Sequence, residues 1–137
     1  MIHAVKALIY NYKKQIFLQQ RDYNPNILFP GHWTLFGGQV EENEEFKTAL
    51  ARELQEELEW KPRFIGDEIF SWFWRNQSIH HNHCFPVFCL NEDKSFKLNE
   101  GNSMRWFDLQ ELNEALIMVP GLKGNLSNIS KFLDELK

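Results

Sequence analysis

The sequence has 137 residues, of which 43% are hydrophobic and 15% aromatic; a chain of this size and composition can bury a substantial core, which excludes a disordered protein and fits one domain over residues 1–137. The net charge is −4 and no run of Lys or Arg is present, so binding to long nucleic acid is disfavoured, because phosphate recognition needs a basic surface. A mildly acidic protein can still bind a small polyanion when a divalent cation lies between them.

Short strands are predicted at the start of the chain. The hydrophobic pattern places them at residues 4–10, 16–20 and 33–36, with a hairpin loop at 11–15 and a polar loop at 21–30. The third strand is expected to end where two consecutive glycines begin.

A helix is predicted at residues 44–58, because apolar residues recur there at four-residue spacing and form one stripe: Phe46, Leu50, Leu54 and Leu58. Pro62 prevents its continuation. Two more strands are predicted at residues 64–74 and 83–90, with a turn at 76–82 between them. A short extended segment follows at 106–107, and two helices close the chain at 109–116 and 126–136. This order predicts an α/β fold with helices packed on a mixed sheet.

The predicted helix carries three carboxylates on one flank. At about 100° per residue, Glu53, Glu56 and Glu57 fall within an arc of about 100°. Repulsion within the i,i+4 pair costs roughly 0.2–0.5 kcal/mol, and acids near a helix C-terminus oppose its dipole. A solvated acidic face is one interpretation. The other is a site for Mg²⁺, which prefers a few carboxylates together with water and phosphate.

Residue spacing decides between the two interpretations. Gly38, Glu44, the pair Arg52-Glu53 and the pair Glu56-Glu57 reproduce the charged positions of the Nudix box at its intervals. The segment 38–60 therefore resembles the Nudix hydrolase family, whose fold is an α/β/α sandwich around a mixed β-sheet. Outside this segment the resemblance is looser and rests on the order of elements.

The resemblance implies a role for each matching residue. Mg²⁺, with Mn²⁺ as an alternative, would be bound by the carboxylates of Glu53, Glu56 and Glu57 and the carbonyl of Gly38. Arg52 would position a catalytic glutamate, Glu44 would tie the loop to the helix, and Gly37 would let the backbone bend. The implied reaction is attack of water on a phosphorus of a diphosphate, with Glu53 as the first candidate for the general base.

Two positions depart from the family pattern. Glu59 replaces the glycine near the end of the box, so the chain either leaves the helix through a left-handed residue, at a cost of roughly 1–2 kcal/mol, or ends the helix differently. Phe36 stands where many relatives carry proline, which indicates a subgroup without naming a substrate.

Two residues outside the box are further candidates. Glu100 lies in a region where many Nudix enzymes place an additional glutamate, and it is the second candidate for the general base. An exposed loop acid is its plainer interpretation. Arg21 follows the second strand, where relatives often bind phosphate through an arginine; a surface salt bridge is the alternative.

Histidines and aromatic residues give weaker signals. His80, His81 and His83 are interpreted as a loop tip beside a strand rather than a metal site, because no Cys or Asp completes a tetrahedral set at the usual spacing. Phe70, Trp72 and Trp74 alternate and share one strand face. Core packing is favoured for them, and stacking on a nucleobase is the alternative.

Cellular location and assembly are weakly constrained. No apolar run reaches the roughly 20 residues that span a bilayer, and no signal peptide is recognisable. Cys84 and Cys89 would point to opposite faces of a strand, so we expect buried free thiols in a reducing cytoplasm and no membrane partner. A homodimer is left open.

The leading functional hypothesis is Mg²⁺-dependent hydrolysis of a small nucleotide substrate, namely a nucleoside triphosphate, nucleotide sugar, ADP-ribose or dinucleoside polyphosphate. The alternative is a Nudix-fold nucleotide-binding or regulatory domain without turnover, which would be expected to have lost the box carboxylates. An isomerase of isoprenoid diphosphates would need a suitably placed catalytic cysteine, and neither cysteine lies in a motif of that kind.

Overall fold

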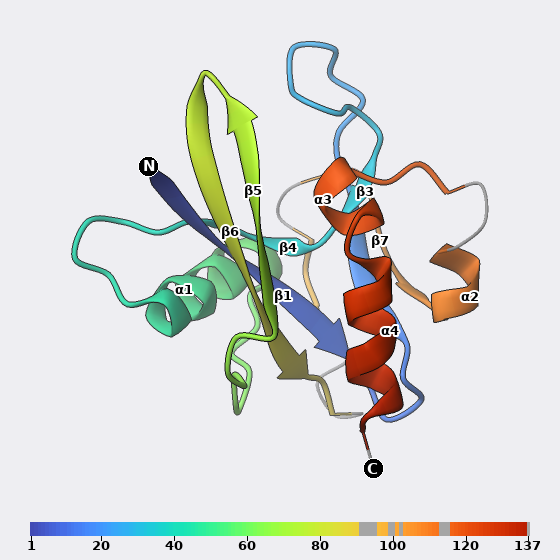
Figure 1. The fold of residues 1–137 in the computed structure, drawn as a ribbon. Helices are drawn as coiled ribbons and strands as arrows, with labels where there is room; N and C mark the ends of the chain where they lie inside the picture. The colour runs from blue at the N-terminus through green and yellow to red at the C-terminus, as the bar shows by residue number, and fades with distance from the viewer. Residues whose placement is uncertain (91–95, 99–100, 102, 113–115, 137) are drawn as a thin grey trace.

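Figure 1 shows the chain as a computed structural model, which describes residues 1–90, 96–98, 101, 103–112 and 116–136. The strands form a seven-stranded sheet, with bounds β1 (Ile2–Tyr10), β2 (Ile16–Gln20), β3 (Trp33–Thr34), β4 (Phe36–Gln39), β5 (Phe70–Asn76), β6 (Ser78–Phe88) and β7 (Ser103–Phe107). The helices are α1 (Phe46–Leu58), α2 (Leu109–Leu112), α3 (Pro120–Lys123) and α4 (Leu126–Asp134). No helix among these residues is both long and apolar enough to cross a membrane.

Strand β1 organises the sheet. It pairs in parallel with β6 from Ile2 to Tyr10 along one edge. Its other edge is divided, because Ala4 to Ala7 pair with β4 and only the last two residues pair with β2, both antiparallel. Strands β2 and β4 therefore lie along the same edge of β1, with β2 at its last residues and β4 nearer its start. The candidate site lies between these two strands.

The two faces of the sheet carry separate cores. Alternate residues of β1, such as Val5 and Ala7, pack with α1, whereas Leu8 packs with α3 and α4. Figure 1 shows α1 on one side of the strands and α4 on the other. The predicted α/β class, with helices on both faces of a mixed sheet, is confirmed.

Several predicted boundaries are wrong. The turn expected at residues 76–82 is confined to Gln77, which has a positive φ of 53°, so β5 and β6 form one long hairpin. Its polar residues belong to strands because alternate side chains, such as His80 and Asn82, line a cavity on one side of the sheet, whereas His83 packs on Phe46 of α1 on the other side. Residues 64–69 form no strand beyond the isolated bridge of Ile65 to Val87. Helix α3 was not expected.

The end of α1 resolves the first departure from the family pattern. Glu59 takes the left-handed conformation, with φ 52° and ψ 40°, and its N–H donates to the carbonyl of Gln55, while the N–H of Trp60 donates to the carbonyl of Leu54. The chain thus leaves the helix as it would through a glycine, but with a side chain present. Left-handed geometry brings the Cβ atom close to the backbone, so this residue stores conformational free energy.

Glu59→Gly is therefore expected to raise the free energy of unfolding by about 1 kcal/mol, measured by urea denaturation without metal. Glu59→Ala is the matched control, because it removes the same side chain but keeps the Cβ atom. Equal changes in the free energy of unfolding for the two substitutions would contradict this. They would show that the change comes from the lost side-chain charge and not from relief of the left-handed backbone.

Candidate active site

The backbone of β4 touches the acidic flank of α1 through its two glycines. The N–H of Gly37 donates to Oε1 of Glu57 at 2.9 Å. A Cβ atom on Gly38 would lie only 2.3 Å from Oε1 of Glu53, so no side chain fits between this strand and the helix. The absence of side chains at these positions lets the carboxylates approach the sheet edge.

Glu57 is buried and held at both oxygens. Its residue is 3% exposed, and Oε2 accepts a second hydrogen bond of 2.9 Å from Nε2 of Gln19 on β2. Burial raises the pKa of Glu57 to about 7, although the bonds from Gln19 and Gly37 and the charge of Lys6 favour its ionised form. A carboxylate placed here gains stability from any cation that reaches it.

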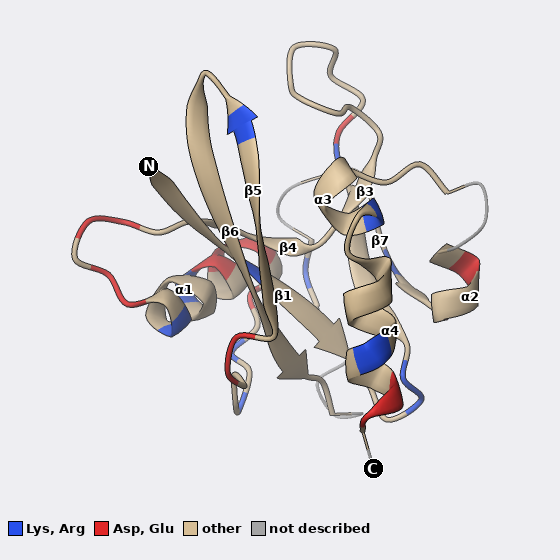
Figure 2. Ribbon diagram, viewed as in Figure 1, with Lys and Arg blue, Asp and Glu red and all other residues tan. Residues whose placement is uncertain are grey.

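Arg52 connects the loop before α1 to the other acids. Its guanidinium forms a fork with Glu44, with Nε and Nη2 each 2.9 Å from a carboxylate oxygen, and Nη2 also donates to the carbonyl of Gln39. Nη1 lies 3.0 Å from Oε1 of Glu53 and 3.4 Å from Oε1 of Glu56. Figure 2 shows the acidic residues of this loop and of α1 together. Arg52 therefore holds Glu53 and Glu56 on the same flank of α1.

These contacts alter the titration of the loop acid. The hydrogen bonds from Arg52 and the N–H of Glu41 lower the pKa of Glu44 to about 2, and the same pairing raises the pKa of Arg52 above its ordinary value. Glu44 and Arg52 therefore both stay charged over the whole physiological pH range, so their ion pair holds the loop against α1 throughout that range.

The donor set fits a hard divalent cation. Glu53, Glu56 and Glu57 could supply oxygen ligands from one flank, and the backbone of Gly38 lies beside Glu53. Mg²⁺ prefers oxygen ligands of this type. Glu56 is the most accessible of the three, with 54% of its side chain exposed, so ions and substrate can approach from solvent.

A polar cavity of about 400 Å³ is lined in part by Glu57. Lys6, Gln19 and Arg21 are among its lining residues. Burial lowers the pKa of Lys6, while the nearby Glu57 opposes this shift. Nε of Arg21 donates to the carbonyl of Leu28 at 2.8 Å, which fixes the guanidinium near the cavity.

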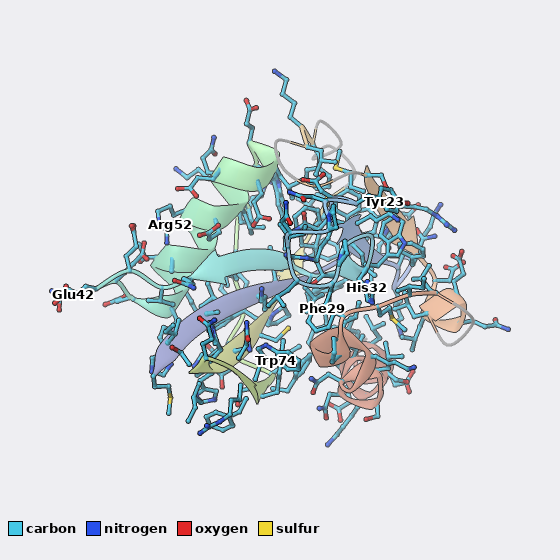
Figure 3. All side chains as sticks on the ribbon, turned by 90° about the horizontal axis from the view of Figure 1, so that it is seen from above. Tyr23, Phe29, His32, Glu42, Arg52 and Trp74 are labelled. Atoms are coloured by element: carbon cyan, nitrogen blue, oxygen red, sulfur yellow. The ribbon has the colours of Figure 1, made fainter. Side chains whose placement is uncertain are left out.

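An aromatic cavity of about 310 Å³ adjoins the polar one and shares Lys6 and Arg21 with it. Trp72, Trp74 and Phe29 line it. The rings of Phe29 and Trp74 meet edge to face with centroids 5.5 Å apart, and Figure 3 shows them beside each other, seen from above. The tryptophans of β5 are thus half-buried and line a cavity. This role is neither plain core packing, which the sequence favoured, nor full exposure for stacking on a base.

Helix α3 closes this cavity from the other side. A Cβ atom on Gly121 would lie 2.5 Å from Nε1 of Trp72, so the glycine permits close contact between helix and indole. The unexpected helix therefore shapes the cavity wall.

Comparisons with known proteins identify the family. The sequence model of the NUDIX domain matches residues 2–127. The chain belongs to the NUDIX family. No curated protein matches the sequence significantly.

Solved Nudix structures share the whole fold. The MutT protein of Methanosarcina mazei superimposes with a TM-score of 0.84 at 22% identity, covering 98% of this chain and 96% of that one. A Caenorhabditis elegans Ap4A hydrolase in a binary complex gives 0.78 at 20% identity, covering 99% and 100%. The NUDIX domain of Shewanella oneidensis NrtR, complexed with ADP ribose, gives 0.78 at 17% identity, covering 97% and 88%.

The structure brings the Nudix box residues together, whereas one further candidate is not among the residues that it describes. Glu100 falls outside the described residues. Gln19 carries no sequence signal and Lys6 only a weak one, because each lies within a strand pattern and reaches the site only through the pairing of β1 with β4 and β2. A charged residue in an otherwise apolar first strand is the one indication that Lys6 gives.

Glu44→Gln is expected to remove a pH-dependent part of the stability of this Nudix domain. The folded-state pKa of Glu44 is depressed to about 2, so its contribution is complete above its ordinary pKa and is lost as the pH falls toward 2. The stability gap between wild type and Glu44→Gln should narrow from about pH 7 to about pH 3 in metal-free urea denaturation.

The same comparison in an Arg52→Gln background supplies the control, because the partner that depresses the pKa is absent there. A gap that stays constant with pH in the wild-type background would contradict the role of the fork.

Proposed function

We propose that the chain is a Mg²⁺-dependent hydrolase that cleaves a diphosphate bond in a nucleoside diphosphate linked to a further group. One observation supports this proposal above all. Glu57, which accepts hydrogen bonds from Gly37 and Gln19, lines a polar cavity that adjoins an aromatic one. Carboxylates, basic groups and aromatic rings thus follow one another in the order that phosphates and a nucleobase require.

Glu53, Glu56, Glu57 and the carbonyl of Gly38 would hold Mg²⁺. When bound, Mg²⁺ would offset the negative charge of the diphosphate oxygens and of the acids themselves. The chain contributes a rigid frame for these ligands, because Arg52 positions Glu53 and the N–H of Gly37 positions Glu57.

Lys6 and Arg21 would bind the phosphates. Both line the two cavities at their junction, and an arginine fork matches the geometry of a phosphate. The nucleobase would then lie in the aromatic cavity against Trp72 or Trp74, because every base presents a flat face that stacks on an indole.

Glu53 is the proposed general base. Its side chain is 16% exposed and is oriented by Arg52, so it can reach a water molecule and accept its proton as the oxygen attacks phosphorus. Glu57 is less suited, because both of its oxygens already accept hydrogen bonds. Glu100 remains the second candidate.

The substrate class covers nucleoside triphosphates, nucleotide sugars, ADP-ribose and dinucleoside polyphosphates. Two similar structures were solved of an Ap4A hydrolase and of a domain bound to ADP ribose, which supports testing both compounds first. Cys84 is a buried free thiol, which fits action on cytoplasmic nucleotides.

Purified protein is expected to release phosphate, pyrophosphate or a nucleoside monophosphate from at least one member of this panel with Mg²⁺, and not with EDTA. Glu57→Gln should lower kcat at least about 100-fold, because it removes a charge from the metal ligands. Glu59→Gln is the matched control, since it makes the same chemical change at an exposed residue of the helix end and should retain activity.

Two outcomes would contradict the proposal. Turnover that is equal in Glu57→Gln and wild type, with both folded, would exclude the carboxylate site. Saturable binding of ADP-ribose or Ap4A without turnover at any metal concentration would favour the alternative, a nucleotide-binding domain that does not catalyse hydrolysis.

A further inference from the structure

Three histidines meet on the face of the sheet that packs against α1. His81 and His83 lie on β6, and His3 lies opposite His81 in the parallel register of β1 and β6. Residues two apart on a strand point to the same side, so all three rings face α1. The ring of Phe46, the first residue of α1, lies 4.4 Å from His83 and 5.4 Å from His3, measured between centroids.

The ring nitrogens of the three histidines converge. Nδ1 of His3 lies 3.0 Å from Nε2 of His83, and one nitrogen from each of His3, His81 and His83 lies within 4.8 Å of the others. Nitrogen ligands of a tetrahedral zinc, each about 2.0–2.1 Å from the metal, stand about 3.3–3.4 Å apart. Small rotations of these rings would produce that spacing.

Glu68 orients the central histidine. Its Oε1 accepts a hydrogen bond of 2.6 Å from Nδ1 of His83, so the proton resides on Nδ1 and the lone pair of Nε2 points toward His3. A metal-binding histidine typically donates its second ring N–H to a carboxylate, which fixes its tautomer and increases its basicity. Ring packing alone does not require this carboxylate.

His81 supplies an independent indication. Within the part of the chain that the structure describes, its buried Nε2 has no hydrogen-bond partner, while Phe73 stacks on the ring with centroids 4.2 Å apart. A buried polar atom without a partner is unfavourable. A cation among the three nitrogens would supply the missing interaction.

We propose that His3, His81 and His83 form a second metal site, for Zn²⁺ or a similar borderline divalent cation, with Glu68 behind His83 as the orienting carboxylate. Imidazole nitrogens favour Zn²⁺ over Mg²⁺, so this site differs in chemistry from the carboxylates of α1. The sequence spacing conceals it because the third ligand comes from a different strand.

The fourth coordination position would be open. A cavity of about 420 Å³, lined by His3, Phe46 and the loop at residues 39–44, opens beside the cluster, so water or an exogenous ligand can complete a tetrahedron. The bound ion would join the start of β1 to β6, and the folded state would gain stability with rising zinc concentration.

The test uses tag-free protein that has been stripped with EDTA and dialysed against Zn²⁺ in the presence of excess Mg²⁺. Elemental analysis is expected to find one equivalent of zinc per chain. Substitution of Co²⁺ should give the intense visible absorption of a four-coordinate site. The melting temperature should rise by roughly 5–10 °C at a hundred-fold excess of zinc over its Kd.

Variants separate this site from the carboxylates. His81→Gln, His83→Gln and His3→Gln should each abolish stoichiometric zinc binding, and Glu68→Gln should weaken it by about 10- to 100-fold. His32→Gln is the matched control, because it removes a histidine that bonds to Pro30 far from the cluster. A Glu53→Gln, Glu57→Gln double variant should lose hydrolysis and keep zinc, so failure of either proposal is distinguishable from failure of the other.

Circular dichroism of each variant establishes that it is folded. If His81→Gln does not fold, His3→Gln and the surface variant Glu68→Gln decide the matter. The proposal is overturned if folded wild type takes up no stoichiometric zinc, if the histidine variants bind zinc as wild type does, or if the zinc disappears in the carboxylate double variant.

Discussion

The approach of two consecutive glycines of β4 to the acidic flank of α1 is the constraint on which the site depends. At Gly37 a Cβ atom would lie 2.0 Å from the carbonyl oxygen of Val5, and at Gly38 it would meet the Glu53 carboxylate. The space saved allows an N–H of β4 to reach Glu57. Hydrogen bonds to a charged group contribute about 1.5–3 kcal/mol each, which offsets much of the cost of burying this acid.

Side chains alternate along β1 and β6, so the two faces of the sheet carry different groups: residues that line the aromatic cavity on one face and the histidine cluster on the other. Lys6 and His80 belong to the residues that line the aromatic cavity, whereas His3 and His81 belong to the set that faces α1. One strand pair in parallel register thus contributes to both the aromatic cavity and the histidine cluster. The sheet lies between them, and α1 supplies Phe46 to the histidine cluster and Glu57 to the polar cavity that adjoins the aromatic one.

The sequence predicts those parts of the molecule that depend on local spacing. Helix α1, with its carboxylates on one flank, follows from periodicity, and the family follows from the Nudix box. Lys6 and the grouping of His3 with His81 depend on which strands pair and in which register, and hydrophobic pattern does not determine either. The hairpin at Gln77 was missed because polar strand residues that line a cavity resemble a turn. Glu59 shows the reverse case: a violation of the pattern singled out this position with two alternatives open, and the structure contains the left-handed one.

Anomalous diffraction from crystals soaked in Mn²⁺ tests the central claim most directly, because this ion substitutes for Mg²⁺ at oxygen sites and its anomalous signal distinguishes it from water. The account predicts a peak within about 2.0–2.4 Å of oxygens from at least two of Glu53, Glu56 and Glu57, next to the Gly38 backbone. Well-ordered carboxylates with no peak at saturating Mn²⁺, or with Arg52 occupying the position of the ion, would contradict it.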